Sequence, residues 1–386
     1  MDSYSFLQKS VFIILLTVMA LWTTFANASA INHTSATQAY MIDYDTGLVL
    51  YKKNENQRMP TSSMSKAMTA YMVFEALKDG RLSLNDKLNI SEKAWRKAGS
   101  KMFVKVGERV SIDDLLNGIL VQSGNDATIV VAEGLAGSEN SFAEAMTMKA
   151  HELGMMNTNF VNASGWPDEN HYSTASDLAL MAMSIVRNFP EYMPYFSRKE
   201  FTYNNIEQKN RNPLLYRNIG ADGLKTGHTE AGGYGLIGTG LSDDNRRVIL
   251  VLNGLESISD RANESARLLQ WGLNGFDNIV FTAAGETITK VPVVFGKSKN
   301  VALTINEDVF ITVPKLKKPD VTMTAKFSGP LTAPIAAGQE VGTLVVDIPE
   351  SGSKEYKLYT ASSVEELGLF AHALARFKMI ISGASE

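Results

Sequence analysis

Three short polar segments of this 386-residue chain carry the residue types needed for nucleophilic chemistry. In chain order they are Ser63-Met64-Ser65-Lys66, then Ser123-Gly124-Asn125, and then Lys225-Thr226-Gly227. A serine hydroxyl is a weak nucleophile until a neighbouring base takes its proton. Lysine can be that base if its pKa falls well below the ordinary value of about 10.4. The three segments together therefore predict a serine acyl-transfer site.

The residues around Ser63 favour this interpretation. Pro60, Thr61 and Ser62 precede an apolar run that starts at Lys66 and ends near Asp79-Gly80, so we expect a helix to begin close to Ser63. Residues three apart on a helix share a face, which lets the amine of Lys66 reach the Ser63 hydroxyl. The free N–H groups of a helix start also suit a developing oxyanion.

Each of the first two motifs also has a second match elsewhere in the chain. Ser351-Gly352-Ser353-Lys354 follows a proline and precedes a Tyr/Leu run, which predicts a turn between strands rather than a helix start. Ser138-Glu139-Asn140 has no apolar run immediately before it and is typical of a helix cap. Order and local context therefore favour Ser63 and Ser123 over these matches.

Ser123 and Asn125 lie between two apolar runs, residues 115–121 and 127–132. A polar hinge between two helices would bring a hydroxyl that relays a proton, and an amide that holds Lys66 or a substrate carbonyl, to the wall of a cleft. The alternative is an ordinary helix-helix turn capped by Asn125 and Asp126.

Lys225-Thr226-Gly227-His228-Thr229 leads into a glycine-dense stretch at residues 232–240 and then the apolar run 248–252. Glycine inside a strand often marks close approach of another backbone, so we expect a strand beside the substrate. The alternative is an edge hairpin with a solvated Lys225. Gly233-Tyr234-Gly235-Leu236-Ile237-Gly238 matches a dinucleotide motif in spelling only, because a second strand rather than a helix follows it.

The three motifs, in this order, resemble those of the penicillin-binding proteins and serine β-lactamases. The Ser-Gly-Asn form, the His228-Thr229 continuation and the chain length resemble the low-molecular-mass D-alanyl-D-alanine carboxypeptidases (peptidase family S11). Residues 37–50 and the loop segments 162–167 and 171–175 also look like this family, and the resemblance extends over roughly residues 35–370. It implies an α/β (α+β) catalytic domain followed by a small all-β sandwich domain.

The resemblance implies a role for each motif residue. Ser63 would attack the carbonyl between two terminal D-alanines, with Lys66 as its base and Ser123 passing a proton to the leaving amine. Asn125 would bind the peptide, and the backbone N–H groups of Ser63 and His228 would form the oxyanion hole. Lys225 would supply positive potential, and Thr226 and Thr229 would hold the terminal carboxylate. Arg261 would help to bind this carboxylate, with Arg267 as an alternative.

Related reaction classes fit less well. A class A β-lactamase needs a glutamate in a Glu-x-x-x-Asn loop, whereas Asn170 follows Glu169 directly and position 173 is serine. A β-lactamase is therefore the runner-up. His171 could be a catalytic imidazole, but a hydrogen bond that orders its loop is the favoured interpretation. With no cysteine and no histidines paired at ligand spacing, a zinc peptidase would have almost no ligands to use, and we expect no metal and no cofactor.

Composition and the chain ends indicate where the chemistry takes place. Residues 1–28 combine Lys9, an apolar run over residues 11–22 and Ala26-Asn27-Ala28, which predicts a secretory signal peptide. A net charge of −4 with 20% charged residues and no basic stripe argues against a nucleic-acid partner. We therefore expect an exported protein, and the family resemblance implies the periplasmic side of the bacterial inner membrane.

The pattern changes near residue 280. Residues 29–279 mix helical runs with strands and hold all three motifs, whereas 280–361 are short Val/Ile/Thr/Phe runs between Gly, Pro, Asp and Lys, which predict a β-sandwich. Apolar residues recur at helical spacing from Val364 to Ile381, which predicts that 362–386 form an amphipathic helix lying on a membrane surface. The alternative is a helix packed on the sandwich itself.

Two alternative functions remain for a chain with this family resemblance. The first is an exported carboxypeptidase that trims D-alanine from peptidoglycan stem pentapeptides and is inhibited by β-lactam antibiotics as acylating agents. The second is a wall-associated protein that can be acylated but turns over too slowly to act as an enzyme. All motif residues are present, which favours the first.

Overall fold

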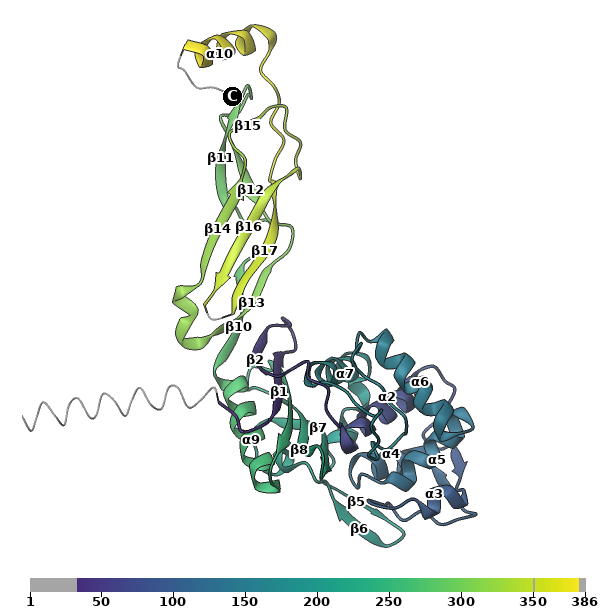
Figure 1. Cartoon of the computed structure of the whole chain (residues 1–386). Helices are drawn as coiled ribbons and strands as arrows, with labels where there is room; N and C mark the ends of the chain where they lie inside the picture. Colours follow the sequence, from purple (N-terminus) through teal and green to yellow (C-terminus); the bar gives the residue numbers. More distant parts are fainter. Residues whose placement is uncertain (1–32, 350, 382–386) are drawn as a thin grey trace, which may run out of the picture. The chain divides into compact units, whose positions relative to one another are not determined.

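The computed structural model describes residues 33–349 and 351–381, so the predicted signal peptide, 1–28, lies outside the described residues. The chain divides into two compact units between Asn274 and Gly275 (Figure 1). The boundary expected at 279/280 falls inside strand β10 (Phe276–Thr282). This strand pairs with β13 (Val309–Pro314), so it belongs to the second unit.

The first unit is built on a five-stranded antiparallel sheet. The strand order is β2-β1-β9-β8-β7, with bounds Val49–Lys53, Gln38–Asp43, Arg247–Leu255, Gly233–Leu241 and Ala221–Thr229. Along β9, Ile249 and Val251 belong to one hydrophobic cluster, and Leu250 and Leu252 belong to another. Because side chains alternate along a strand, both faces of this sheet are covered.

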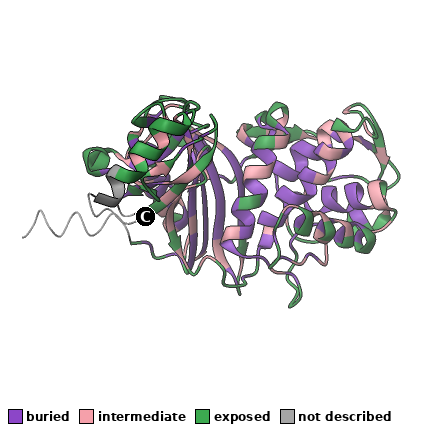
Figure 2. Ribbon diagram, turned by 90° about the horizontal axis from the view of Figure 1, so that it is seen from above, coloured by how far each residue is buried: buried purple, intermediate pink, exposed green. Residues whose placement is uncertain are grey.

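Helices cover the two faces. Helix α9 (Ile258–Asn274) packs on β8 and β9, and α7 (Ala175–Asn188) packs on β9 and β1 (Figure 1). The other longer helices are α2 (Lys66–Lys78), α4 (Ile112–Leu120), α5 (Asn125–Ala136) and α6 (Glu139–Glu152). In Figure 2 the buried residues concentrate in the strands of the sheet and in the helices beside it.

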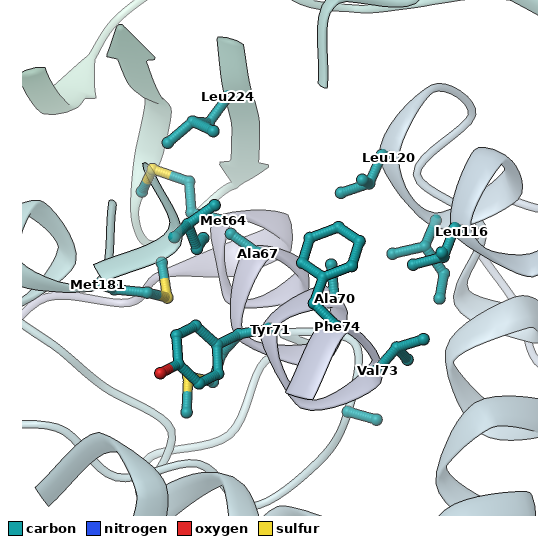
Figure 3. Close-up of a cluster of buried hydrophobic side chains, with 14 of the residues drawn as sticks. Met64, Ala67, Ala70, Tyr71, Val73, Phe74, Leu116, Leu120, Met181 and Leu224 are labelled. Carbon is teal, nitrogen blue, oxygen red and sulfur yellow. The ribbon is translucent and has the colours of Figure 1, made fainter. Parts of the chain in front are cut away.

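Helix α2 is the centre of the larger core. Nine of its thirteen residues are buried, including the whole first half of the helix, Lys66 to Tyr71. Figure 3 shows Phe74 beside Leu116 and Leu120 of α4, with Tyr71 on another side of the helix and Leu224 of β7 nearby. Because the first half of α2 is fully packed, the residues at its start have a fixed position.

Shorter elements complete the first unit. Two small antiparallel sheets form from β3 (Lys87–Asn89) with β4 (Arg109–Ser111) and from β5 (Glu200–Tyr203) with β6 (Ile206–Lys209). The short helices are η1 (Ser62–Ser65), α3 (Glu92–Arg96), η2 (Pro190–Tyr192), α8 (Pro194–Ser197) and η3 (Pro213–Tyr216).

The second unit is an all-β domain, as expected. Its larger sheet has the order β14-β16-β17-β12-β11-β15, and β10 and β13 form the other. The bounds are Thr322–Phe327, Glu340–Ile348, Gly352–Thr360, Asn300–Thr304, Thr289–Val294 and Leu331–Thr332, with η4 at Lys315–Asp320. One cluster joins Ile311 and Val313 of β13 to Leu303, Leu344 and Leu358 of the larger sheet. The two sheets therefore share a sandwich core.

The predicted C-terminal helix begins later than expected. Helix α10 runs over Leu369–Ile381 rather than from Val364. Val364 is buried and bridges Ile335, and Glu366 bridges Gly296, so this stretch is held extended against the sandwich. Among the described residues, no helix is long and apolar enough to cross a bilayer.

Candidate active site

The first motif brings Ser63 and Lys66 together. Ser63 lies in the 3₁₀ turn η1, and α2 starts at Lys66. The Nζ of Lys66 donates a hydrogen bond to Ser63 Oγ at 2.8 Å and another to the carbonyl of Ser164 at 2.7 Å. Lys66 is fully buried, whereas Ser63 is partly exposed. The arrangement leaves Ser63 partly accessible and keeps its amine partner out of water.

Burial and neighbouring cations lower the pKa of Lys66. Desolvation is the largest cause, followed by the charges of Lys225 and Arg211, and the result is a pKa well below 10.5. A lysine in such surroundings is neutral at a much lower pH than a solvated one, so it can accept a proton. Lys225 of the third motif therefore acts on Lys66 as a nearby cation.

The second motif lies between α4 and α5, as its flanking runs indicated. Ser123 is 1% exposed, has a positive φ of 60°, and its Oγ has no hydrogen-bond partner among the described residues. Asn125 is buried, and its Nδ2 donates to the carbonyl of Ala98 at 2.8 Å. The amide therefore ties down the segment before residue 100, a contact that the sequence did not indicate.

Asp126 has a role that the sequence missed. Its carboxylate accepts backbone N–H groups from Met102, Phe103 and Val104 at 2.9, 2.9 and 3.2 Å. A carboxylate that accepts several N–H bonds holds a loop firmly. The sequence indicated only a helix-capping role for Asp126, because the loop it holds lies more than twenty residues earlier.

The third motif lies on β7, at the edge of the sheet. Lys225 and Thr226 are buried, and Lys225 Nζ donates to the carbonyl of Thr226 at 3.1 Å. A β-carbon on Gly227 would lie 3.0 Å from the carbonyl oxygen of Thr61, so the strand runs directly against η1. The His228 ring is exposed and stacks on Tyr234 at 3.9 Å.

Thr229 ends this strand. Its Oγ1 accepts hydrogen bonds from Ser62 Oγ at 3.2 Å and from the backbone N–H of Gly232 at 3.0 Å. Four residues separate it from Lys225, which at about 3.3 Å per residue places them about 13 Å apart along the strand. The two side chains therefore serve different ends of the site.

Arginines add positive charge near Lys225. Arg261 is buried, and its Nη1 donates to the carbonyl of Gly227 at 3.3 Å, whereas Arg267 pairs with Glu264 and with the carbonyl of His33. Burial, followed by the charges of Arg211 and Arg261, lowers the pKa of Lys225 to about 7. Arg211 lies in a polar run, Gln208-Lys209-Asn210-Arg211-Asn212, without a pattern that could have identified it.

The loop over residues 162–172 closes against the turn that holds Ser63. Asn162 Oδ1 accepts the backbone N–H groups of Gly165 and Trp166, each at 2.9 Å. His171 Nδ1 accepts the N–H of Val161, so its Nε2 carries the proton and donates to Ser65 Oγ at 2.8 Å. This geometry supports the interpretation that His171 orders the loop.

Among the described residues, no cluster of three His, Asp or Glu side chains could hold a metal ion. Ser138 caps α6 by accepting from Ser141 N, and Ser351 lies at the turn between β16 and β17. The two other motif matches are therefore a cap and a turn. Together, the fold and the Ser-Lys pair define a serine enzyme of the penicillin-binding and β-lactamase type.

Comparison with known proteins gives the family. Residues 24–256 match the D-alanyl-D-alanine carboxypeptidase family, and residues 276–366 match the C-terminal domain of penicillin-binding protein 5. The chain belongs to the D-alanyl-D-alanine carboxypeptidase family. The expected family, two-domain fold and enzyme class are confirmed.

Individual relatives agree. The chain is similar to the D-alanyl-D-alanine carboxypeptidase DacA of Haemophilus influenzae, with 38% identity over 86% of each chain. It is also similar to the solved structure of DacD from Francisella tularensis, with 31% identity, a TM-score of 0.79, and 87% and 95% of the two chains covered. Penicillin-binding protein D2 of Listeria monocytogenes, solved with cefotaxime bound, matches 62% of this chain and 98% of its own at 32% identity and a TM-score of 0.57.

Proposed function

We propose that Ser63 is the nucleophile of an exported serine-type D-Ala-D-Ala carboxypeptidase that removes the terminal D-alanine from peptidoglycan stem pentapeptides. The observation that carries this proposal is the 2.8 Å contact between Lys66 Nζ and Ser63 Oγ, in which the amine is fully buried. Membership of the carboxypeptidase family supports the substrate class.

In the proposed acylation, neutral Lys66 takes the proton of Ser63 as Oγ attacks the carbonyl between the two D-alanines. The backbone N–H groups of Ser63 and His228 would stabilise the oxyanion. Ser123 would then pass a proton to the leaving amine, which frees D-alanine and leaves an ester on Ser63. The Ser123 hydroxyl is buried and has no hydrogen-bond partner within the described part of the chain, which supports this role, since a relay group needs an uncommitted oxygen. Water would then hydrolyse the ester.

The terminal carboxylate of the substrate would lie at the Lys225 end of β7. Lys225, Thr226 and Arg261 are the residues assigned to it, and Arg211 adds charge at the same end. The hydrogen bonds that Thr229 already accepts favour a different role for this residue, which is to fix the turn beside Ser62. Asn125 would contribute its remaining amide oxygen to the bound peptide.

Location is a separate part of the proposal. The signal-like composition of residues 1–28 supports export. Helix α10 presents four strongly exposed apolar side chains, Leu369, Phe370, Leu374 and Phe377, which supports peripheral attachment to the periplasmic face of the inner membrane. Packing of α10 on its own sandwich is the competing arrangement, and a ring contact between His372 and Phe295 favours it locally.

The central experiment measures D-alanine release from diacetyl-Lys-D-Ala-D-Ala by the wild type and by Ser63→Ala. We expect release only from the wild type. No release by the wild type would reject the enzyme and favour the slow-turnover binding protein, whereas equal release by both would reject Ser63 as the nucleophile.

Penicillin turnover by the wild type and by Ser63→Ala distinguishes the carboxypeptidase from a β-lactamase. We expect penicillin to acylate Ser63 and to be released slowly, as befits an inhibitor. The sequence around Glu169 supports this expectation. A class A β-lactamase needs a glutamate followed four residues later by asparagine, whereas the residue four positions after Glu169 is Ser173. Rapid turnover of penicillin by the wild type would favour the β-lactamase.

A further inference from the structure

Gln122, the residue before the proposed relay serine, is fully buried, and only one of its two polar atoms is bonded. Its Nε2 donates to the carbonyl of Phe201 at 3.2 Å, whereas its Oε1 has no hydrogen-bond partner within the described part of the chain. A buried oxygen without a partner destabilises a fold. Methionine has a similar length and lacks this oxygen, so stability alone would favour methionine at position 122. The contact with Phe201 therefore points to a role in the site.

The backbone of Ser123 has to be held by its neighbours. Its φ of 60° lies in the left-handed region, which a residue other than glycine adopts at a cost in energy and keeps only where its surroundings enforce it. On one side, the N–H of Gly124 donates to the carbonyl of Gly118 at 2.8 Å. On the other side, the side chain of Gln122 bonds to Phe201. These two contacts flank the serine.

The carbonyl that accepts from Gln122 belongs to the hairpin of β5 and β6, which are joined by a two-residue turn. This hairpin is itself fixed at two points. Asn204 Nδ2 donates to the carbonyl of Phe103 at 2.9 Å. Gln208 Nε2 donates to the carbonyl of Lys101 at 3.0 Å. The hairpin is therefore tied to the loop beside the second motif and gives Gln122 a fixed anchor.

We propose that Gln122 is a positioning residue for the proton relay, because its contact with the β5–β6 hairpin holds Ser123 Oγ where it can protonate the leaving amine. The proposal rests on the carboxypeptidase function proposed above. In acylation the proton of Ser63 goes to Lys66, Lys66 passes a proton to Ser123, and Ser123 gives its own to the nitrogen as the C–N bond breaks. A displaced Ser123 slows the breaking of that bond.

The leaving group decides how much a substrate depends on Ser123. An amine must be protonated as it leaves, whereas a thiol has a pKa of about 8.5 and leaves readily as the thiolate. The test therefore compares kcat/KM for diacetyl-Lys-D-Ala-D-Ala and for the thioester diacetyl-Lys-D-Ala-D-thiolactate, in which sulfur replaces the amide nitrogen. We call the quotient of the two values the amide/thioester ratio. Because kcat/KM ends at the first irreversible step, hydrolysis of the acyl-enzyme does not enter this ratio.

Gln122→Met is the central variant. It should lower kcat/KM for the amide about tenfold or more, as misplacement of a general acid does, and leave the thioester within about twofold of the wild type. Ser123→Ala is the reference and should lower the amide/thioester ratio further. The thioester also reports folding, since a variant that fails to fold loses both activities.

A second variant approaches Ser123 from the hairpin. The double substitution Asn204→Ala, Gln208→Leu removes both contacts with the loop at residues 101–103 and leaves Gln122 intact, so it tests the proposal even if Gln122→Met does not fold. It should lower the amide/thioester ratio in the wild type and change it little in Gln122→Met, because both changes act through one contact. The matched control is Glu207→Gln, an exposed position of β6, which should leave the ratio unchanged.

An unchanged amide/thioester ratio in Gln122→Met would overturn the positioning role, whether both values stay at the wild-type level or fall by one common factor. The role is also rejected if the hairpin variant lowers the ratio equally with and without Gln122, since the hairpin then acts by another route. If Ser123→Ala lowers both substrates equally, the relay and its positioning residue fall together while the carboxypeptidase stands. Absence of D-alanine release by the wild type would instead reject the carboxypeptidase itself.

Discussion

The carbonyl oxygen of Ser62 and the α-carbon of Gly165 are in such close contact that a β-carbon on Gly165 would lie 1.7 Å from that oxygen. Gly165 also has a φ of +77°, which disfavours any side chain. The loop over residues 162–172 can therefore close on the turn of the proposed nucleophile only because this position is glycine.

Gly165→Ala should disable the site. Both clashing groups are backbone, so either the loop or the Ser63 turn must move, and a displacement of that size should slow acylation by a fluorescent penicillin about 100-fold or more. Gly137→Ala is the control, because Gly137 has a φ of +74° with nothing within 4 Å of a β-carbon. An equal effect of both substitutions would mean that backbone strain, rather than the contact, is responsible.

The pH dependence of kcat/KM should be bell-shaped. Activity rises with pH as Lys66 loses its proton, and it falls as Lys225, whose pKa burial lowers to about 7, loses the charge that binds the carboxylate. Because kcat/KM reports the free enzyme, the falling limb should begin near pH 7.

Lys225→Arg tests the assignment of that falling limb. Arginine stays charged to higher pH, so the decrease in kcat/KM should move up by at least about one pH unit. A falling limb that stays in place in Lys225→Arg would assign it to another group. The rising limb serves as an internal control, since it belongs to Lys66 in both proteins.

His171 should make the fold sensitive to acid. Burial lowers its pKa to about 4 from an ordinary value of 6.5. The unfolded chain then binds more protons than the folded chain between these values, so the free energy of unfolding should fall as the pH drops from about 6.5 to about 4. The shift corresponds to about 3 kcal/mol at most.

Urea unfolding of wild type, His171→Gln and His33→Gln at several pH values measures this effect. His171→Gln should lose part of the dependence between pH 4 and 6.5. His33 is exposed, so its substitution should leave the dependence unchanged. The same slope in all three proteins would show that carboxylates alone cause the acid sensitivity.

Helix α10 should govern membrane association. Phe370 is 95% exposed, and burial of one such side chain is worth about 1.5–3 kcal/mol. Phe370→Asp in the chain starting at residue 29 should therefore reduce co-sedimentation with anionic lipid vesicles about tenfold or more. Met323→Asp, at an exposed apolar position of β14, is the control. No sedimentation of the wild type would favour packing of α10 on the sandwich.

Local geometry explains which features could be predicted. Ser63 and Lys66 are three residues apart, so a helical turn alone brings them together. The strand β9 and the short strands after residue 280 could likewise be predicted, because the pattern of apolar residues within a single strand is visible in the sequence. The predicted start of α10 was wrong because the bridges of Val364 and Glu366 to the sandwich override helical spacing in that stretch.

The amino-acid sequence alone was sufficient to predict that Lys66 lies beside Ser63, and also the family and the two-domain plan. The packed structure was needed to show that Lys66 is fully buried, that Arg261 rather than Arg267 lies at β7, that Arg211 adds charge beside Lys225, and that Asp126 holds the 102–104 loop. These relations join residues far apart in the chain. Periodicity describes one element at a time, whereas burial and charge depend on every element packed around a group.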